Sequence, residues 1–178
     1  RLIAYGMERG INFLDTATLY DNYSSIKKAM AYSDKELLIS TKSYDYDKKG
    51  VQKNLHNALR QLDREYIDIY MLHEQESIHT IRGHWEAIEY LIKEKKKGNI
   101  RALGISTHRV EGVYGACEIP ELEVIHPIIN VKGLGIEDGS REDMEKAIAY
   151  AKSKGKGIYA MKIFGGGNLS GHAEACFE

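Results

Sequence analysis

Cysteine and proline are both scarce in this chain of 178 residues, with two of each. Cys117 and Cys176 stand far apart without the spacing of a metal site, and we expect no disulfide between them. Such cysteine usage is typical of a reducing compartment, so we expect a cytoplasmic protein. No linker-like or low-complexity stretch interrupts the chain, which predicts a single domain over residues 1–178.

Net charge and long apolar runs are also lacking. The formal net charge is −1, so no basic field favours a nucleic-acid partner. No apolar run approaches the roughly 20 residues that cross a bilayer, and no signal-peptide pattern is present. We therefore expect neither nucleic acid nor a membrane as a partner.

Apolar runs of strand length alternate with segments of helical period along the whole chain. The predicted strands cover residues 11–17, 36–42, 66–73, 100–107, 123–130 and 157–164. The predicted helices cover residues 2–9, 22–32, 51–62, 81–97, 109–116 and 140–155. Ser140 is the expected N-cap of the last helix, with Asp143 completing a capping box. In the helix at 81–97, Trp85, Ile88, Leu91 and Ile92 are expected to form a buried stripe.

This strict alternation of strand and helix predicts an α/β fold with a parallel sheet covered by helices. Six such units fit either a doubly wound sheet or most of a TIM barrel. A doubly wound nucleotide-binding sheet normally carries a glycine-rich G-x-G-x-x-G turn after its first strand, and none follows residues 11–17. The sequence therefore favours an incomplete TIM (β/α)8-type barrel with about six of its eight βα units.

Four ionisable residues lie at or near the ends of the first three predicted strands: Asp15, Tyr20, Lys42 and His73. Taken singly, each has an ordinary explanation, because Asp15 could cap a helix or pair with Lys42, and His73 could be a satisfied core residue. Burying all four near one barrel axis costs several kcal/mol of desolvation free energy. Folds seldom tolerate such a cost away from functional sites. Together they can form a proton donor for a carbonyl oxygen, as a reductase requires.

The segments GINFLDTATLYDN, LLISTK, LDREYIDIYMLH and KKGNIRALGIST resemble the aldo-keto reductases, in order and spacing. The HPIIN and MKIFGGGNL segments are most similar to predicted aldo/keto reductase-like oxidoreductases of anaerobic bacteria. The resemblance implies a TIM barrel that binds NADPH or NADH and reduces aldehyde or ketone groups of small molecules. It implies Tyr20 as general acid, Lys42 as the group that lowers the tyrosine pKa, Asp15 as partner of Lys42, and His73 as the residue that orients the carbonyl.

The same resemblance implies four residues that bind the cofactor. Ser106 and Thr107 stand where relatives hold the nicotinamide carboxamide. His126 stands where many relatives have glutamine, and Met161 where many have an aromatic side chain that stacks on the nicotinamide. Both substitutions are departures from the family pattern, although methionine can still pack against a π face.

The resemblance begins at the end of the family's first helix and runs through its seventh strand. We therefore expect a chain truncated at both ends, without the first and eighth barrel strands, and weak or inactive by itself. Its open sheet edges would expose backbone donors and acceptors, through which the chain could self-associate.

Two other classes of function stay open from the sequence. The family also includes cofactor-binding regulatory subunits that do not catalyse, and the four residues do not exclude this role. A metal-dependent barrel hydrolase could use His73, His108 and His126 with Asp15, although no strand carries the H-x-H pair common in such barrels.

Overall fold

The computed structural model describes residues 2–32 and 36–177 of the chain. The fold divides into two compact units, each made of two separate stretches of chain. The first unit consists of Arg1–Leu72 with Trp85–Leu103, and the second of His73–His84 with Gly104–Glu178.

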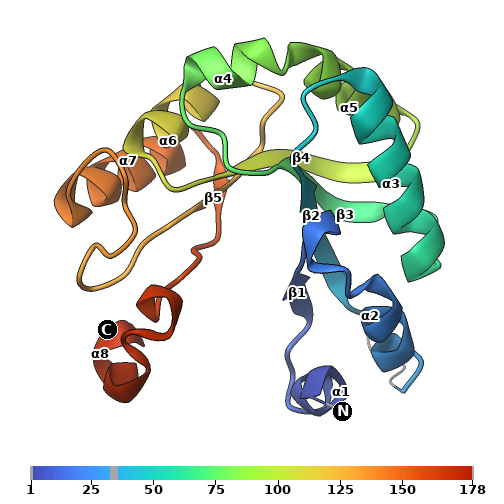
Figure 1. The fold of residues 1–178 in the computed structure, drawn as a ribbon, viewed down its shortest axis with the longest axis horizontal. Helices are drawn as coiled ribbons and strands as arrows, with labels where there is room; N and C mark the ends of the chain where they lie inside the picture. Colours follow the sequence, from blue (N-terminus) through green and yellow to red (C-terminus); the bar gives the residue numbers. More distant parts are fainter. Residues whose placement is uncertain (1, 33–35, 178) are drawn as a thin grey trace. The chain divides into compact units, whose positions relative to one another are not determined.

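In the first unit, parallel strands alternate with helices (Figure 1). Its strands are β1 (Phe13–Asp15), β2 (Leu38–Ser43), β3 (Ile67–Leu72) and the first half of β4 (Ile100–Thr107). Its helices are α1 (Leu2–Glu8), the short 3-10 helix η1 (Thr18–Tyr20), α2 (Tyr23–Met30), α3 (Lys48–Leu62) and α5 (Trp85–Lys96). Helix α3 packs between α2 and α5.

Helix α3 illustrates why these residues form this layer. Asp47 caps its start by accepting a hydrogen bond from the backbone N–H of Gly50 at 2.7 Å. Apolar residues then recur at helical spacing, and Val51, Leu55, Ala58 and Leu62 are all buried. One face of α3 is therefore fixed in the core by the sequence pattern itself.

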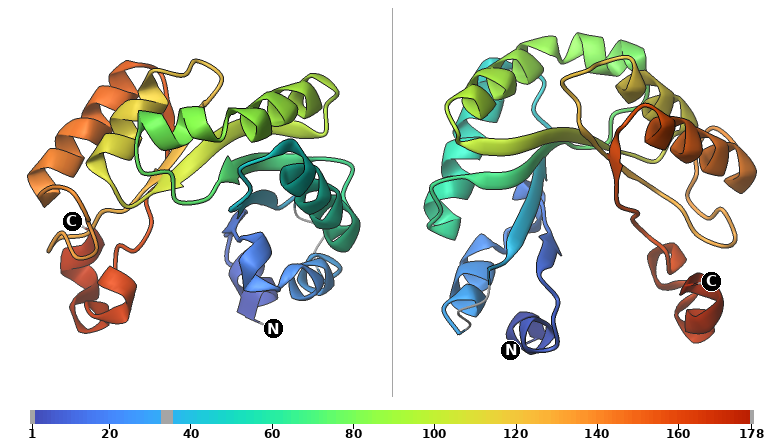
Figure 2. Two further views of the ribbon diagram at one scale, coloured as in Figure 1. Left: turned by 45° about the horizontal axis from the view of Figure 1, so that its top comes forward. Right: turned by 180° about the vertical axis from the view of Figure 1, so that it is seen from behind.

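In the second unit, helices α6 and α7 lie side by side, and α6 also packs on α4 (Figure 2). The strands are the second half of β4, β5 (Val124–Pro127) and β6 (Gly157–Ile158). The helices are α4 (Ile78–Gly83), α6 (Val110–Cys117), α7 (Arg141–Ser153), the 3-10 helices η2 (Gly165–Gly167) and η3 (Ser170–His172), and α8 (Ala173–Phe177).

The strand order is that of the chain, β1 to β6, and the described strand pairs are parallel. A doubly wound sheet would reverse its strand order at a switch point, whereas a (β/α) barrel adds each strand beside the previous one. The predicted incomplete TIM-type barrel with six strands is therefore confirmed.

The helix predicted over residues 81–97 is wrong in one respect, because two helices replace it. Helix α4 begins earlier, after a capping box at Ser77, and ends at Gly83. His84 has non-helical backbone angles, and α5 starts at Trp85. Trp85 was expected in a buried stripe, but it is 40% exposed at the start of α5.

Near the start of β3, the buried carboxylate of Asp68 connects several segments of the first unit. Asp68 accepts a hydrogen bond from the backbone N–H of Ile39 in β2 at 2.9 Å. The same carboxylate pairs with Arg64 at 3.1 Å and with Arg101 at 3.3 Å, and the Arg101 guanidinium lies 3.8 Å from the centre of the Tyr66 ring. Asp68 therefore links two strands and two arginines within the first unit.

Candidate active site

The two faces of β2 can be told apart by the partners of its alternate side chains. Thr41 shares a 2.6 Å hydrogen bond with the hydroxyl of Tyr23 in α2, and Ser43 shares one of 2.9 Å with the hydroxyl of Tyr70. Burial raises the pKa of both tyrosines, so both stay protonated. Because neighbouring residues of a strand point to opposite faces, Lys42 lies on the face away from α2.

Asp15 and Lys42 form an ion pair on that face. Asp15 ends β1 in register with Ser40, so its side chain shares the face of Ser40 and Lys42. The Lys42 Nζ donates to Asp15 Oδ2 at 2.5 Å and to the backbone oxygen of Thr16 at 2.9 Å. The Lys42 side chain is 1% exposed, whereas that of Asp15 is 29% exposed. Burial lowers the pKa of Lys42, and the Asp15 charge opposes this shift.

Tyr20 completes the group in the first unit. It ends η1, and the next residue, Asp21, has a left-handed backbone with φ of 48° that terminates this turn. The Lys42 Nζ lies 5.4 Å from the centre of the Tyr20 ring, within the range of a cation–π contact. Tyr20 is 49% exposed, so the ring is open to solvent while the ammonium beside it is buried. The structure thus brings together three of the four predicted catalytic residues.

His73, the fourth predicted residue, belongs to the second unit, where it directly follows β3 and is buried. The turn that begins at His73 is hydrogen-bonded to β4. The backbone N–H of Glu74 donates to Ser106 Oγ at 2.9 Å, and that of Gln75 donates to the Ser106 carbonyl at 2.8 Å. The Gln75 side chain also donates to the His73 carbonyl at 3.2 Å. Ser106 therefore positions the turn around His73.

Ser106 and His126 are register partners in β4 and β5, so their side chains share one face of the sheet. Thr107, one residue further, points to the other face. Its hydroxyl accepts from the Arg109 backbone N–H at 3.0 Å, and a Cβ added to Gly112 of α6 would collide with this oxygen. The pair Ser106 and His126 thus lies on the face away from α6, whereas Thr107 contacts the helix.

Tyr159 is a site neighbour that the sequence did not indicate. Its ring stacks on the His126 imidazole with 4.0 Å between ring centres and 20° between planes. His126 Nδ1 also hydrogen-bonds the Tyr159 carbonyl at 2.8 Å. Met161 follows two residues later, half-buried, and bridges to Ile128. The alternation of Tyr159 and Met161 along one extended segment was the available signal.

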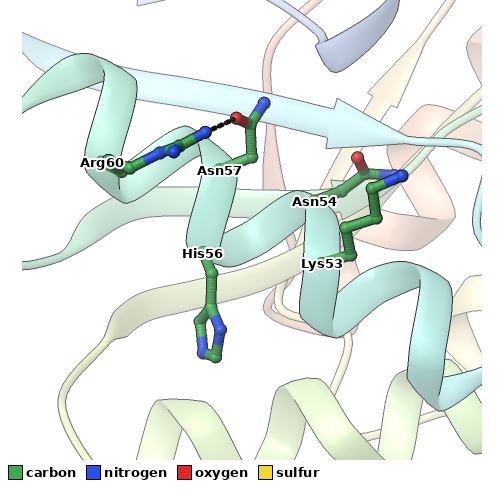
Figure 3. Close-up of a pocket in the computed structure, with 5 residues that line it drawn as sticks. All are labelled: Lys53, Asn54, His56, Asn57 and Arg60. Carbon is green, nitrogen blue, oxygen red and sulfur yellow. Dashed lines mark hydrogen bonds between the residues drawn. The ribbon is translucent and has the colours of Figure 1, made fainter.

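A polar cavity lies on α3 in the first unit, away from these residues in sequence (Figure 3). It is lined by Lys53, Asn54, His56, Asn57 and Arg60. Arg60 donates to Asn57 at 3.1 Å, the bond drawn in Figure 3. These are solvated or locally paired side chains of one helix surface, and they do not include any predicted site residue.

Over residues 2–32 and 36–177, no helix is both long and apolar enough to cross a membrane. In the same part of the chain, no three His, Cys, Asp or Glu side chains are grouped so that they could hold a metal ion. His73, His108 and His126, the histidines of the hydrolase hypothesis, do not belong to such a group within these residues.

Comparison with known proteins gives one family. The model of the Aldo/keto reductase family matches residues 1–175. Methylglyoxal reductase DkgA of Escherichia coli K12 is 24% identical over 170 residues, covering 90% of this chain and 61% of its own. Aldehyde reductase YPR1 of Saccharomyces cerevisiae is 23% identical over 189 residues, which cover 91% of this chain and 59% of the yeast protein. The chain thus spans about three fifths of the length of these curated relatives.

Solved structures agree on the fold. MGS-M4, an aldo-keto reductase from a Medee basin deep-sea metagenome library, superimposes with a TM-score of 0.77 at 19% identity, covering 94% of this chain and 60% of its own. The Bombyx mori aldo-keto reductase AKR2E4 in complex with NADP superimposes with a TM-score of 0.71 at 18% identity. The match covers 92% of this chain and 55% of the Bombyx mori chain.

Proposed function

This chain belongs to the aldo/keto reductase family, and from that premise we propose that the protein reduces aldehyde or ketone groups of small molecules with NADPH or NADH. The observation that carries the proposal is the buried Lys42 ammonium, paired with Asp15 and lying beside the exposed ring of Tyr20. A buried lysine is costly, and one placed next to an accessible phenol has a use in proton transfer.

Each of the three site residues in the first unit has a role in this proposal. Tyr20 donates its hydroxyl proton to the substrate carbonyl oxygen as general acid. The Lys42 ammonium stabilises the phenolate that remains, because an opposite charge nearby favours the charged form. Asp15 keeps Lys42 in place through the 2.5 Å ion pair. In the second unit, His73 is assigned the role of orienting the carbonyl.

The second unit offers side chains that suit a nicotinamide cofactor, which supplies the hydride when bound. Ser106 and His126 place a hydroxyl and an imidazole on the face of β4 and β5 away from α6, and both can hydrogen-bond a carboxamide. The stacked Tyr159 fixes the His126 ring. Met161 is proposed to pack on the nicotinamide. The prediction for Thr107 depends only on its place beside Ser106.

The names of the relatives suggest the first substrates to test. We propose small aldehydes and ketones, with methylglyoxal as the first candidate because one relative is a methylglyoxal reductase. The assay follows the loss of reduced-nicotinamide absorbance with NADPH and with NADH, on the chain extended by any flanking coding sequence. Turnover is expected. Cofactor binding without turnover of any carbonyl would favour the non-catalytic alternative instead.

The ion pair predicts how activity depends on pH. The Lys42 pKa is lowered by burial, so the ammonium loses its proton at a lower pH than an ordinary lysine. We expect kcat/KM to fall at alkaline pH, below the ordinary lysine value of about 10.4. Asp15 raises the Lys42 pKa, so Asp15→Asn should move this fall to still lower pH.

The matched control is Asp21→Asn, because Asp21 is an exposed carboxylate next to Tyr20 and asparagine tolerates its left-handed backbone. The pH profile of this variant should resemble that of the wild type. An alkaline limb that stays in place or rises in Asp15→Asn would contradict the role given to the ion pair.

A further inference from the structure

In the second unit, the side chains of Glu74 and Lys162, from two separate segments, reach the imidazole of His108 in a third. The Lys162 Nζ lies 2.9 Å from His108 Nε2. On the other side of the ring, His108 Nδ1 lies 3.7 Å from a carboxylate oxygen of Glu74. Glu74 belongs to the turn after β3, His108 directly follows β4, and Lys162 lies beyond β6. The His108 side chain is largely buried.

Two of the three residues have unfavourable backbone conformations. Glu74 has φ of 51° and Lys162 has φ of 57°, in the left-handed region that side chains other than glycine seldom adopt. Such strain persists only where the surroundings hold the residue in place. The Glu74 backbone is held by its hydrogen bond to Ser106 Oγ, and the side chains of Glu74 and Lys162 both reach the His108 imidazole.

The geometry fixes the protonation of His108 in this arrangement. An ammonium can only donate, so His108 Nε2 must accept the hydrogen bond from Lys162. In a neutral imidazole the proton is then on Nδ1, which faces Glu74 and also Glu137, at 3.6 Å. When a second proton arrives it must bind Nε2. Both atoms of the 2.9 Å contact are then donors, and the hydrogen bond cannot exist.

The other charged side chains near the ring form ion pairs with one another. Glu137 precedes α7 and pairs with Arg109 at 2.9 Å, while Arg109 also lies 3.9 Å from Glu76. Protonated His108 would therefore be attracted to Glu74 and Glu137 and repelled by Lys162. Both effects separate the imidazole from Lys162 and leave its contacts with the carboxylates intact.

We propose that Glu74, His108 and Lys162 form a pH-sensitive clasp, which holds the segment after β6 to the turn after β3 while His108 is neutral and releases it when His108 is protonated. The segment is suited to such release, because Gly165, Gly166 and Gly167 all have positive φ and form no long helix or strand. Histidine is the side chain that ordinarily changes charge between pH 5 and 8.

The clasp goes beyond the proposed reductase function and does not depend on it. It nevertheless borders residues assigned to that function, because Glu74 directly follows His73 and Lys162 directly follows Met161. Acidification would thus loosen the segment next to Met161 while β5 and α7 stay folded. His108 is a positioning residue in this scheme, since it acts through its two neighbours.

Hydrogen–deuterium exchange followed by mass spectrometry tests the clasp. Exchange is measured at about pH 7.5 and about pH 5.5 and corrected for the intrinsic chemical rate. In the wild type, peptides over 162–169 should exchange about tenfold faster at the lower pH, the effect of losing one charge-assisted hydrogen bond. Peptides of α3 in the first unit and of α7 in the second should show no such change.

Two variants separate the clasp from general loosening. In His108→Gln the side-chain amide can accept from Lys162 and donate to Glu74 at any pH, so residues 162–169 should exchange slowly at both values. In Lys162→Met the bond is absent, so exchange should be fast at both. Equal exchange of the wild type at the two pH values, or a pH response in Lys162→Met like that of the wild type, would overturn the proposal.

Discussion

Replacing Tyr20 with phenylalanine is expected to lower kcat for carbonyl reduction by about 100- to 10,000-fold, the range that a positioned general acid contributes. The phenyl ring keeps the contact with the Lys42 ammonium, 5.4 Å from the ring centre, but has no proton to donate. The affinity for NADPH should stay within about twofold, because Tyr20 is not among the residues assigned to the cofactor. Steady-state kinetics with methylglyoxal and a fluorescence titration with NADPH measure the two quantities.

Tyr32→Phe is the matched control, since Tyr32 is an exposed tyrosine two residues after the end of α2. It removes a hydroxyl from the same unit and should leave kcat unchanged. If Tyr20→Phe and Tyr32→Phe turn over substrate equally well, Tyr20 is not the acid and the proposed function fails at its first step.

Removing the Asp68 carboxylate is expected to cause the largest loss of stability. Asp68→Ala leaves the Ile39 N–H without its buried acceptor and deprives Arg64 and Arg101 of their shared partner. Breaking a buried ion pair in this way costs about 3–5 kcal/mol in the free energy of unfolding. For a chain of this length, the melting temperature should fall by roughly 10 °C, as followed by circular dichroism.

Two further variants define the cause of that loss. Asp68→Asn retains an acceptor for Ile39 but loses the charge, so its melting temperature should lie between those of the wild type and Asp68→Ala. Glu89→Ala removes a carboxylate from the exposed pair with Lys93 on α5 and should change the melting temperature little. Equal destabilisation by Glu89→Ala and Asp68→Ala would show that the buried network is not special.

The sequence predicted best those elements with strong signals at both ends. The strand over residues 100–107 is found with the predicted bounds as β4. Helix α7 begins after Ser140, and Asp143 completes the capping box as expected. In both cases an apolar period and a local stop signal agree, so no distant contact was needed to place the boundaries.

Boundaries that depend on tertiary contacts were predicted less well. The segment at 157–164 was expected to be one strand, but only Gly157–Ile158 forms β6 and Met161 adds a single bridge. The apolar pattern continues beyond the point where a neighbouring strand is available to pair. The break at His84 was missed because the helical period of residues 81–92 continues across it.

For the candidate site, the sequence indicated which residue types would be used but not all of their contacts. Strand-end positions predicted the pair Asp15 and Lys42, because a lysine at the end of an apolar strand is costly to bury without an opposite charge. The stacking of Tyr159 on His126 joins residues that are distant in the sequence. The contact of His108 with Lys162 is of the same kind, and such contacts require the folded backbone.

The path of the chain through its two units has a practical consequence for dissecting the protein. The backbone passes from one unit to the other after Leu72, His84 and Leu103, the last of these within β4. A single cut therefore cannot liberate either half intact, and a truncation series would remove pieces of both. Isolating the half that contains Tyr20 would instead require a rewired gene in which a short bridge replaces residues 73–84, and that shortened protein would carry Lys42 but not His73.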